Sequence, residues 1–260
     1  MPVLTTNGQT ISYIKEGSGP VVVFLHSLGS SLHMWREQIA ALKSSYTTIA
    51  LDFRGHGQSG NGEINLSAGA GDIKALLDHL GVNRCDLVGI SMGGSIALIF
   101  YAQWPDMVRS LVLAGCCARV AEDSAERVEA TREAIAYISM QEFGTQYAAE
   151  CLMPSTPLLV QEELAGVIAR ISPKVYIQSM NSALLDDIMP LLPSVRVPTL
   201  VLIGENEMAT LREEAEFLVQ NISGATLEVI PAAGHLSCLD NPADFNTALA
   251  KFFEANQASP

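Results

Sequence analysis

The sequence has few cysteines and no long apolar run. Its five Cys are an odd number, and neither a C-x-x-C pair nor a metal-ligand spacing occurs among them. We therefore expect reduced, mostly buried thiols. No apolar segment reaches the length that a bilayer requires, and the N-terminus lacks a basic stretch followed by an apolar run. These absences predict a cytoplasmic protein without a membrane partner.

Positive charge is also scarce. The 15 Lys and Arg are outnumbered by 28 Asp and Glu, so the formal net charge is −13. A surface of this sign repels phosphate backbones, and we expect no nucleic-acid partner. Hydrophobic residues make up 48% of the chain and charged residues 17%, which is ordinary for a globular domain with a real core.

Short apolar runs recur along the chain, and most of them lack the alternation of a half-exposed strand. An N-terminal hairpin is predicted around Asn7-Gly8, with strands at 3–5 and 10–14. Six further strands are predicted at 21–25, 47–51, 86–90, 110–114, 199–203 and 226–230. Helix-like stretches separate them, including 32–42, 72–80 and 92–104. The pattern predicts an α/β fold with a mostly parallel eight-stranded sheet flanked by helices.

The alternation breaks between residues 115 and 198, for about eighty residues, which is far longer than an ordinary loop. Residues 125–138 and 160–171 have helical composition, and prolines punctuate the segment. We expect an inserted helical cap over residues 116–195. The core would then consist of residues 1–115 and 196–260.

A nucleophile motif follows the predicted strand 86–90. Gly89-Ile90-Ser91-Met92-Gly93 fits G-x-S-x-G at the point where a buried strand ends and a helix begins. Glycine is needed there because side chains on either side of so sharp a turn would collide with the neighbouring strand or helix. Ser91 is therefore the candidate nucleophile.

A serine hydroxyl needs a base, and His235 is the best candidate for it. It follows the last predicted strand, and loops at the carboxyl edge of a parallel sheet are where active sites assemble. The other histidines all precede Ser91, whereas the partners of this motif follow in the order Ser, acid, His.

The imidazole in turn needs a carboxylate to fix its tautomer. The strand 199–203 is followed by Gly204-Glu205-Asn206-Glu207, so Glu207 and Glu205 are both candidates, with Glu207 preferred. The developing oxyanion needs backbone donors. We predict the N–H groups of Met92 and of Leu28, the latter in preference to Ser27.

Together these residues resemble the α/β-hydrolase superfamily over the predicted core. Residues 52–59 (DFRGHGQS) are similar to its D-x-R-G-H-G-x-S loop, to which the resemblance assigns a structural role. Residues 26–35 (HSLGSSLHMW) and 234–237 (GHLS) look like the corresponding stretches of 3-oxoadipate enol-lactonases, which hydrolyse a small carboxylated enol-lactone. The family usually carries Asp at the position of Glu207 and Gly at that of Ser27.

The expected activity is hydrolysis of a small carboxylic ester or lactone through an acyl-enzyme on Ser91, with no metal or organic cofactor. Ser27, His26 and Trp35 are predicted to contact the substrate, although a histidine in such a loop can instead bond to nearby backbone. Two alternatives keep the fold: a carbon–carbon bond hydrolase, or a ligand-binding or signalling protein with little turnover. The natural substrate and the oligomeric state are left open.

Overall fold

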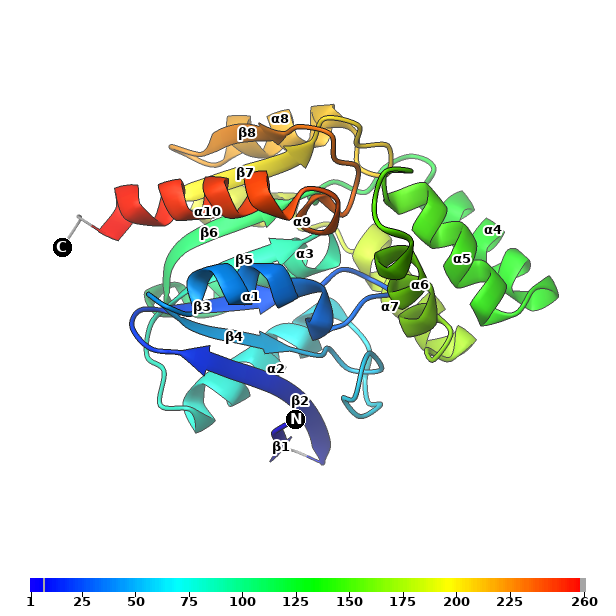
Figure 1. Ribbon diagram of the computed structural model, residues 1–260, viewed down its shortest axis with the longest axis horizontal. Helices are drawn as coiled ribbons and strands as arrows, with labels where there is room; N and C mark the ends of the chain where they lie inside the picture. Colours follow the sequence, from blue (N-terminus) through cyan, green and yellow to red (C-terminus); the bar gives the residue numbers. More distant parts are fainter. Residues whose placement is uncertain (7, 258–260) are drawn as a thin grey trace.

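The computed structural model describes residues 1–6 and 8–257, and an eight-stranded sheet forms its centre (Figure 1). The strands are β1 (Val3–Thr6), β2 (Gln9–Gly17), β3 (Val21–Leu25), β4 (Thr47–Leu51), β5 (Cys85–Ile90), β6 (Val108–Ala114), β7 (Thr199–Gly204) and β8 (Thr226–Ile230). Their order across the sheet is β1-β2-β4-β3-β5-β6-β7-β8. The β1–β2 and β2–β4 pairs are antiparallel and all others are parallel, which confirms the predicted fold class.

The apolar runs form strands because both faces of the sheet are covered. Successive side chains of a strand point to opposite faces. In β3, Val23 and Leu25 belong to one hydrophobic cluster, while Val22 and Phe24 belong to a second on the other face. The hairpin of β1 and β2 forms as predicted, although Asn7 of the predicted turn lies outside the described residues.

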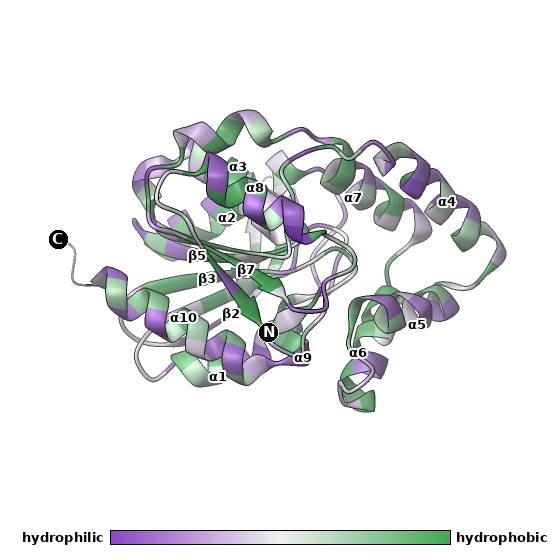
Figure 2. Cartoon of the chain, turned by 90° about the horizontal axis from the view of Figure 1, so that it is seen from above, coloured by the Kyte–Doolittle hydropathy of each residue, from purple (hydrophilic) through white to green (hydrophobic). Residues whose placement is uncertain are grey.

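Helices pack on both faces of the sheet, α1 and α10 on one side and α2, α3 and α8 on the other (Figure 2). Their bounds are α1 (Arg36–Leu42), α2 (Leu66–His79), α3 (Met92–Gln103), α8 (Arg212–Asn221), α9 (Ser237–Asp240) and α10 (Pro242–Gln257). Three 3-10 helices accompany them: η1 (Leu32–Trp35), η2 (Pro105–Met107) and η3 (Met189–Ser194).

Helix α2 begins six residues before the predicted start at residue 72. Asn65 caps it, because the side-chain oxygen accepts a hydrogen bond of 2.7 Å from the Ala68 N–H. Two glycines in the first two turns, Gly69 and Gly71, hide this start from the apolar periodicity.

Four α-helices lie between β6 and β7, beyond the carboxyl ends of the parallel strands (Figures 1 and 2). They are α4 (Ser124–Tyr137), α5 (Met140–Cys151), α6 (Leu158–Ile168) and α7 (Pro173–Leu185). Helix α4 packs against α7, and α5 against α6. We call this segment the cap. Its division from the core at residues 116 and 195 stays a prediction.

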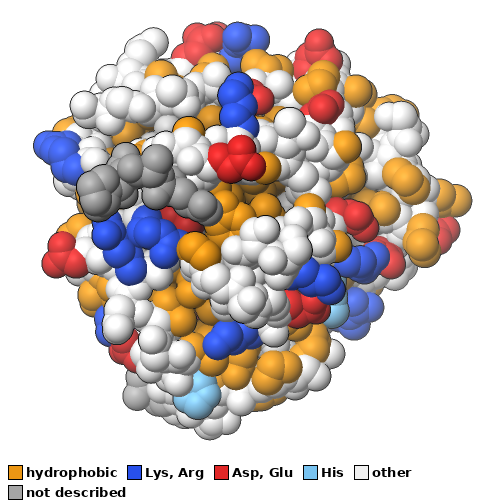
Figure 3. Space-filling model, turned by 60° about the vertical axis from the view of Figure 1, so that its left-hand side comes forward, with side chains coloured by type: hydrophobic (Ala, Val, Ile, Leu, Met, Phe, Trp, Pro, Cys, Tyr) orange, Lys and Arg blue, Asp and Glu red, His pale blue; other side chains and the backbone are white. Residues whose placement is uncertain are grey.

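The side of the molecule where α10 ends carries acidic and basic side chains interspersed with apolar ones (Figure 3). Among residues 1–6 and 8–257, no helix is both long enough and apolar enough to cross a bilayer.

Candidate active site

Ser91 occupies a strained turn between β5 and α3. Its φ of 53° and ψ of −122° place a non-glycine residue in a sparsely populated region of backbone space. The turn is held by a hydrogen bond of 2.8 Å from the Ser91 N–H to the Ala114 carbonyl at the end of β6. A strained backbone of this kind persists only where the surrounding structure holds it in place. Here it places a half-buried serine at the carboxyl edge of the sheet.

The two glycines of the motif are needed for space. A Cβ on Gly89 would lie 2.4 Å from the Gly93 carbonyl oxygen, and one on Gly93 would lie 2.2 Å from the Leu25 carbonyl oxygen. Both distances are far below van der Waals contact, and both obstacles are backbone. The steric reason inferred from the sequence is therefore the one that operates in the fold.

His235 and Glu207 form a buried pair. The His235 Nδ1 lies 2.9 Å from the Glu207 Oε2, and their side chains are 6% and 2% exposed. The other carboxylate oxygen accepts hydrogen bonds of 2.7 Å from the Ala209 N–H and 3.0 Å from the Thr210 N–H. These three contacts leave the carboxylate little freedom to turn away from the imidazole.

Opposing effects set the pKa of Glu207. Burial alone would raise the pKa of this carboxyl group, but the hydrogen bond and charge of His235, together with the Thr210 and Ala209 N–H groups, outweigh burial and lower it. Glu207 is therefore ionised and can only accept, so the His235 proton resides on Nδ1. The Nε2 atom is left as a base.

Gly115 shows how the pair is brought close to Ser91. Gly115 follows Ala114, whose carbonyl accepts the hydrogen bond from the Ser91 N–H. It therefore lies beside the strained turn at Ser91. A Cβ on Gly115 would lie 3.3 Å from the His235 Nδ1 and 3.2 Å from the Glu207 Oε2. Ser91, His235 and Glu207 thus gather around the end of β6, and a glycine with φ of +47° leaves room between them.

Glu205, the other acid predicted from the sequence, faces elsewhere. Its side chain is exposed, and its Oε2 accepts a hydrogen bond of 3.0 Å from the Ala232 N–H. Of the two candidates, the structure brings only Glu207 to His235.

Two backbone N–H groups near the Ser91 turn, those of Met92 and Leu28, are available to a ligand. Met92 is the first residue of α3, where a helix leaves its N–H groups without internal partners. Neither its N–H nor that of Leu28 donates to an acceptor within the described part of the chain. The peptide that carries the Leu28 N–H is fixed at its other end, because the Ser27 carbonyl lies 2.7 Å from the His26 Nδ1 and accepts from the Ser30 N–H at 3.2 Å.

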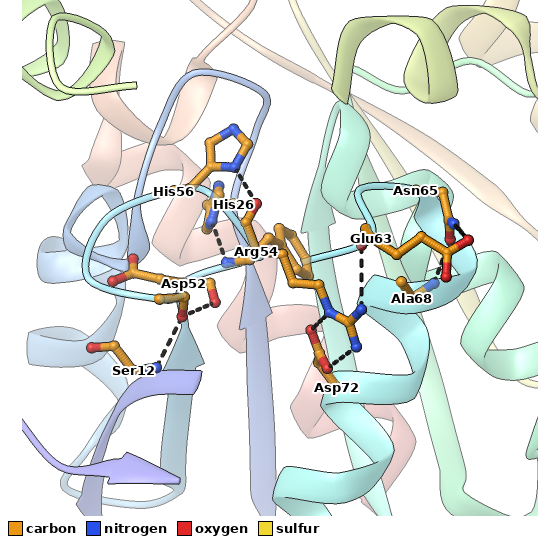
Figure 4. Close-up of polar contacts among 11 residues, drawn as sticks. Ser12, His26, Asp52, Arg54, His56, Glu63, Asn65, Ala68 and Asp72 are labelled. Carbon is orange, nitrogen blue, oxygen red and sulfur yellow. Dashed lines mark hydrogen bonds and ion pairs between the residues drawn. The ribbon is translucent and has the colours of Figure 1, made fainter. Parts of the chain in front are cut away.

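Two buried histidines connect this loop to the loop after β4 (Figure 4). The Phe53 N–H donates to the His26 Nε2 at 2.9 Å, and the Gly29 N–H donates to the His56 Nε2 at 3.3 Å. Burial lowers the pKa of His26 to about 4, against the opposing effect of its bond to Ser27. Burial and the neighbouring His26 lower the pKa of His56 to about 3. Both rings are neutral. Each ring accepts a hydrogen bond from the loop to which the other ring belongs.

The remaining residues of the D-x-R-G-H-G-x-S loop also bind protein groups (Figure 4). The Asp52 carboxylate accepts from the Leu32 and Gln58 N–H groups, both at 2.8 Å. Arg54 forms a two-bond ion pair with Asp72 of α2, at 2.7 and 2.8 Å. The loop holds neighbouring elements in place, consistent with the structural role that the family resemblance implies.

The three residues predicted to contact the substrate are placed differently from that prediction. Ser27, His26 and Trp35 are each 0% exposed. The Ser27 hydroxyl donates to the Leu28 carbonyl at 3.1 Å, and both ring nitrogens of His26 are bonded to backbone. The Trp35 ring packs at 5.1 Å from that of Phe24, in the core beneath the loop. Proximity in sequence to a pocket loop did not predict where these side chains point.

Two other residues fix the site and have no sequence signal that we recognised. The Tyr147 hydroxyl of α5 donates to the Leu28 carbonyl at 3.2 Å, so the cap contacts the loop that carries the free N–H. Asp240 accepts from the Gly234 N–H at 2.7 Å and from the cap residue Met153 at 3.0 Å. Asp240 therefore joins the cap to the loop that carries His235.

The geometry supplies a hydroxyl on a strained turn, an imidazole fixed by a carboxylate, and two backbone N–H groups without an acceptor among the described residues. Such a set has the parts required for acyl transfer. Within the described residues, no group of three or more His, Cys, Asp or Glu side chains is arranged to hold a metal ion.

Comparisons with known proteins agree on one family. A family model described as the alpha/beta hydrolase fold matches residues 20–242. The chain is 30% identical over 252 residues to 3-oxoadipate enol-lactonase 2 of Acinetobacter baylyi, covering 95% of this chain and 94% of the relative. It is 31% identical to 3-oxoadipate enol-lactonase 1 of the same organism, covering 98% of each.

Solved structures agree at the level of the fold. The enol-lactonase from Burkholderia xenovorans LB400 superposes with a TM-score of 0.90 at 24% sequence identity. The alignment covers 97% of this chain and 100% of that one, so the cap as well as the sheet is shared.

Proposed function

The chain belongs to the α/β hydrolase fold family, and we propose that it hydrolyses a small carboxylic ester or lactone through an acyl-enzyme on Ser91. The observation that carries the proposal is the buried His235–Glu207 pair, with 2.9 Å between Nδ1 and Oε2, beside the strained Ser91 turn. A small-molecule substrate is also supported by the enol-lactonase relatives.

In the first half of the reaction, the Ser91 hydroxyl attacks the acyl carbon while the His235 Nε2 takes its proton. Glu207 keeps the Nδ1–H in place and stabilises the imidazolium that forms. The negative oxygen of the tetrahedral intermediate is bound by the Leu28 and Met92 N–H groups. The intermediate collapses as the carbon–oxygen bond breaks and His235 returns its proton to the leaving oxygen.

In the second half, His235 removes a proton from a water molecule, which attacks the acyl-enzyme. The same two N–H groups bind the second oxyanion, and the acid product leaves as Ser91 regains its proton. A lactone gives one hydroxy-acid product, or an oxo acid if the lactone is an enol-lactone. An open ester gives an acid and an alcohol.

We also place the protein in the cytoplasm. All five cysteines are free thiols, which suits a reducing compartment.

The test is turnover of short-chain p-nitrophenyl esters and of enol-lactones, with the products identified by mass spectrometry. Hydrolysis at the acyl–oxygen bond that disappears in Ser91→Ala supports the proposal. Products cleaved at a carbon–carbon bond, with esters untouched, would instead indicate the carbon–carbon hydrolase alternative. Binding of these compounds without any turnover would indicate a ligand-binding protein of the same fold.

A further inference from the structure

The cap is bonded to the loop after β3 at the peptide between Leu28 and Gly29. The Leu28 carbonyl accepts a hydrogen bond of 3.2 Å from the Tyr147 hydroxyl of α5 and one of 3.1 Å from the Ser27 hydroxyl. At the other end of this peptide, the Gly29 N–H donates to the His56 Nε2 at 3.3 Å. Both polar atoms of the peptide are therefore bonded within the protein.

The preceding peptide, between Ser27 and Leu28, is held at its carbonyl. That oxygen lies 2.7 Å from the His26 Nδ1 and accepts from the Ser30 N–H at 3.2 Å. Its N–H, that of Leu28, has no acceptor among the described residues and is one of the two proposed oxyanion donors. The two planar peptides meet at the Leu28 Cα, so bonds to the other three polar atoms fix the direction of this N–H.

The cap also packs on Gly29, the residue after the donor. Its φ of 72° lies in the left-handed region that favours glycine. A Cβ there would lie 3.1 Å from the Ile168 Cγ1 of α6 and 3.2 Å from the Tyr176 Cε2 of α7. Helices α5, α6 and α7 thus meet the same short stretch of the loop, and the bond from Tyr147 makes this contact directional.

Helix α5 is bonded to the loop with His235 as well. One turn after Tyr147, the Cys151 carbonyl accepts a hydrogen bond of 3.3 Å from the Leu236 N–H. The two attachment points are separated by four residues, or about 6 Å along the helix axis. A single rigid helix therefore connects the residue after the base to the loop that carries an oxyanion donor.

We propose that Tyr147 is a positioning residue of the reaction, which directs the Leu28 N–H toward the oxyanion, and that the Ser27 hydroxyl shares this role. The inference rests on the proposed acyl transfer through Ser91. It gives the cap a part in stabilising the transition state, because a displacement of α5 moves the Leu28 carbonyl and turns the donor. Misplacing a group in an active site by about 1 Å can cost on the order of a hundredfold in rate.

Tyr147→Phe is the first test, since it keeps the ring and removes the hydroxyl. We expect kcat for p-nitrophenyl acetate to fall by about tenfold, the value of one hydrogen bond. KM should change by less than about twofold, because the donor acts on the transition state and not on the bound ester. Tyr137→Phe is the matched control. It makes the same change on cap helix α4, at a side chain that is 90% exposed, and should retain the wild-type kcat and KM.

The thionoester of the same acid and leaving group tests the oxyanion directly. In it, sulfur replaces the oxygen that becomes negative, and sulfur is a weak hydrogen-bond acceptor. A misdirected donor should therefore slow the oxygen ester by about tenfold and the thionoester much less, so the ratio of their kcat/KM values falls in Tyr147→Phe. A displaced His235 would instead slow both esters equally and leave the ratio unchanged.

Ser27→Ala removes the other hydroxyl from the same carbonyl. We expect the double variant Ser27→Ala/Tyr147→Phe to lose about a hundredfold or more in kcat, which is the effect of removing one oxyanion donor. Thermal unfolding of Tyr147→Phe should stay close to that of the wild type, because the Leu28 carbonyl keeps the bond from Ser27.

An unchanged kcat in both Tyr147→Phe and the double variant would overturn the inference. A raised KM with an unchanged kcat would do so too, because Tyr147 would then be a substrate contact. An equal loss for the oxygen ester and the thionoester would make its role merely structural. In each of these cases, hydrolysis by the wild type leaves the proposed function standing. If the wild type hydrolyses no ester or lactone, the proposed function fails and the inference fails with it.

Discussion

Glu207 illustrates, at the scale of single residues, how a longer acid can occupy the position where the family usually has aspartate. Two backbone donors, the Ala209 and Thr210 N–H groups, hold one of its carboxylate oxygens, and the other faces His235. The absence of a side chain at Gly115 provides the space. The extra methylene is therefore accommodated by the loop after β7.

Replacing Glu207 by Gln should lower kcat for any ester substrate by about 10²- to 10⁴-fold. The amide can donate to Nδ1, which favours the tautomer with its proton on Nε2, and that tautomer cannot accept the Ser91 proton. Steady-state kinetics measure the loss. Glu205→Gln is the control, and kcat should change by less than about threefold, because this exposed acid bonds to the Ala232 N–H and does not face His235. A larger effect for Glu205 than for Glu207 would contradict the assignment.

At the scale of structural elements, the two loops that follow β3 and β4 depend on neutral histidines. The pKa of His26 is lowered to about 4 and that of His56 to about 3, whereas the ordinary value is 6.5. Between these limits the unfolded chain binds protons that the folded protein does not. The free energy of unfolding should therefore fall as pH decreases from about 6.5 toward 4.

Urea unfolding at pH 7 and pH 5 measures this dependence. Each buried histidine should contribute a loss on the order of 2 kcal/mol between these two pH values. His26→Asn should remove its share, because the amide does not titrate. The exposed His79 provides a control, and His79→Gln should retain the wild-type pH dependence. Equal pH dependence in wild type and His26→Asn would show that His26 does not carry the effect.

Asp240 connects two other elements, the cap and the loop with His235. Its carboxylate accepts from the Gly234 N–H, the Met153 N–H and the Thr156 hydroxyl. Asp240→Asn replaces one acceptor oxygen by a donor group. We expect a loss of about 1–3 kcal/mol in stability and about tenfold in kcat. Asp244→Asn serves as control, since Asp244 is exposed and bonds to Asn241, the residue before α10. A kcat loss in Asp244→Asn equal to that in Asp240→Asn would argue against the connection.

At the scale of the whole molecule, strand β5 of the sheet and helix α4 of the cap differ in the fraction of their residues that is buried. All residues of β5 are buried, whereas in α4 only Ser124 and Val128 are. Local opening is easier where few apolar contacts form. We expect backbone amides of α4 to exchange with deuterium about a hundredfold faster, or more, than those of β5. Mass spectrometry after timed labelling measures this, and equal protection of both elements would contradict the prediction.

The sequence predicted the centre of the sheet well because β3 to β7 are short apolar runs that are almost entirely buried. The segments 21–25, 47–51 and 226–230 match the observed strands to the residue. The start of α2 was missed because capping by Asn65, not apolar periodicity, determines it. In the cap, α5 and α7 were not identified, since their amphipathic pattern is interrupted by polar and small residues.

The candidate site could be predicted only in part, because tertiary packing and not local sequence determines some of its residues. Ser91 and His235 follow from a local motif and from chain order, both of which the sequence contains. Glu205 and Glu207 leave the same strand, and only the packed loops determine which of them faces His235. The direction of its side chain also explains why Trp35 lies in the core.

The most direct test of the account is covalent labelling by a fluorophosphonate probe, followed by intact-mass analysis and peptide mapping. The account predicts one adduct per chain on Ser91, no adduct in Ser91→Ala, and labelling slowed by about a hundredfold or more in Glu207→Gln. An adduct on another residue would contradict the account. So would the absence of labelling in the wild type, or an unchanged rate in Glu207→Gln.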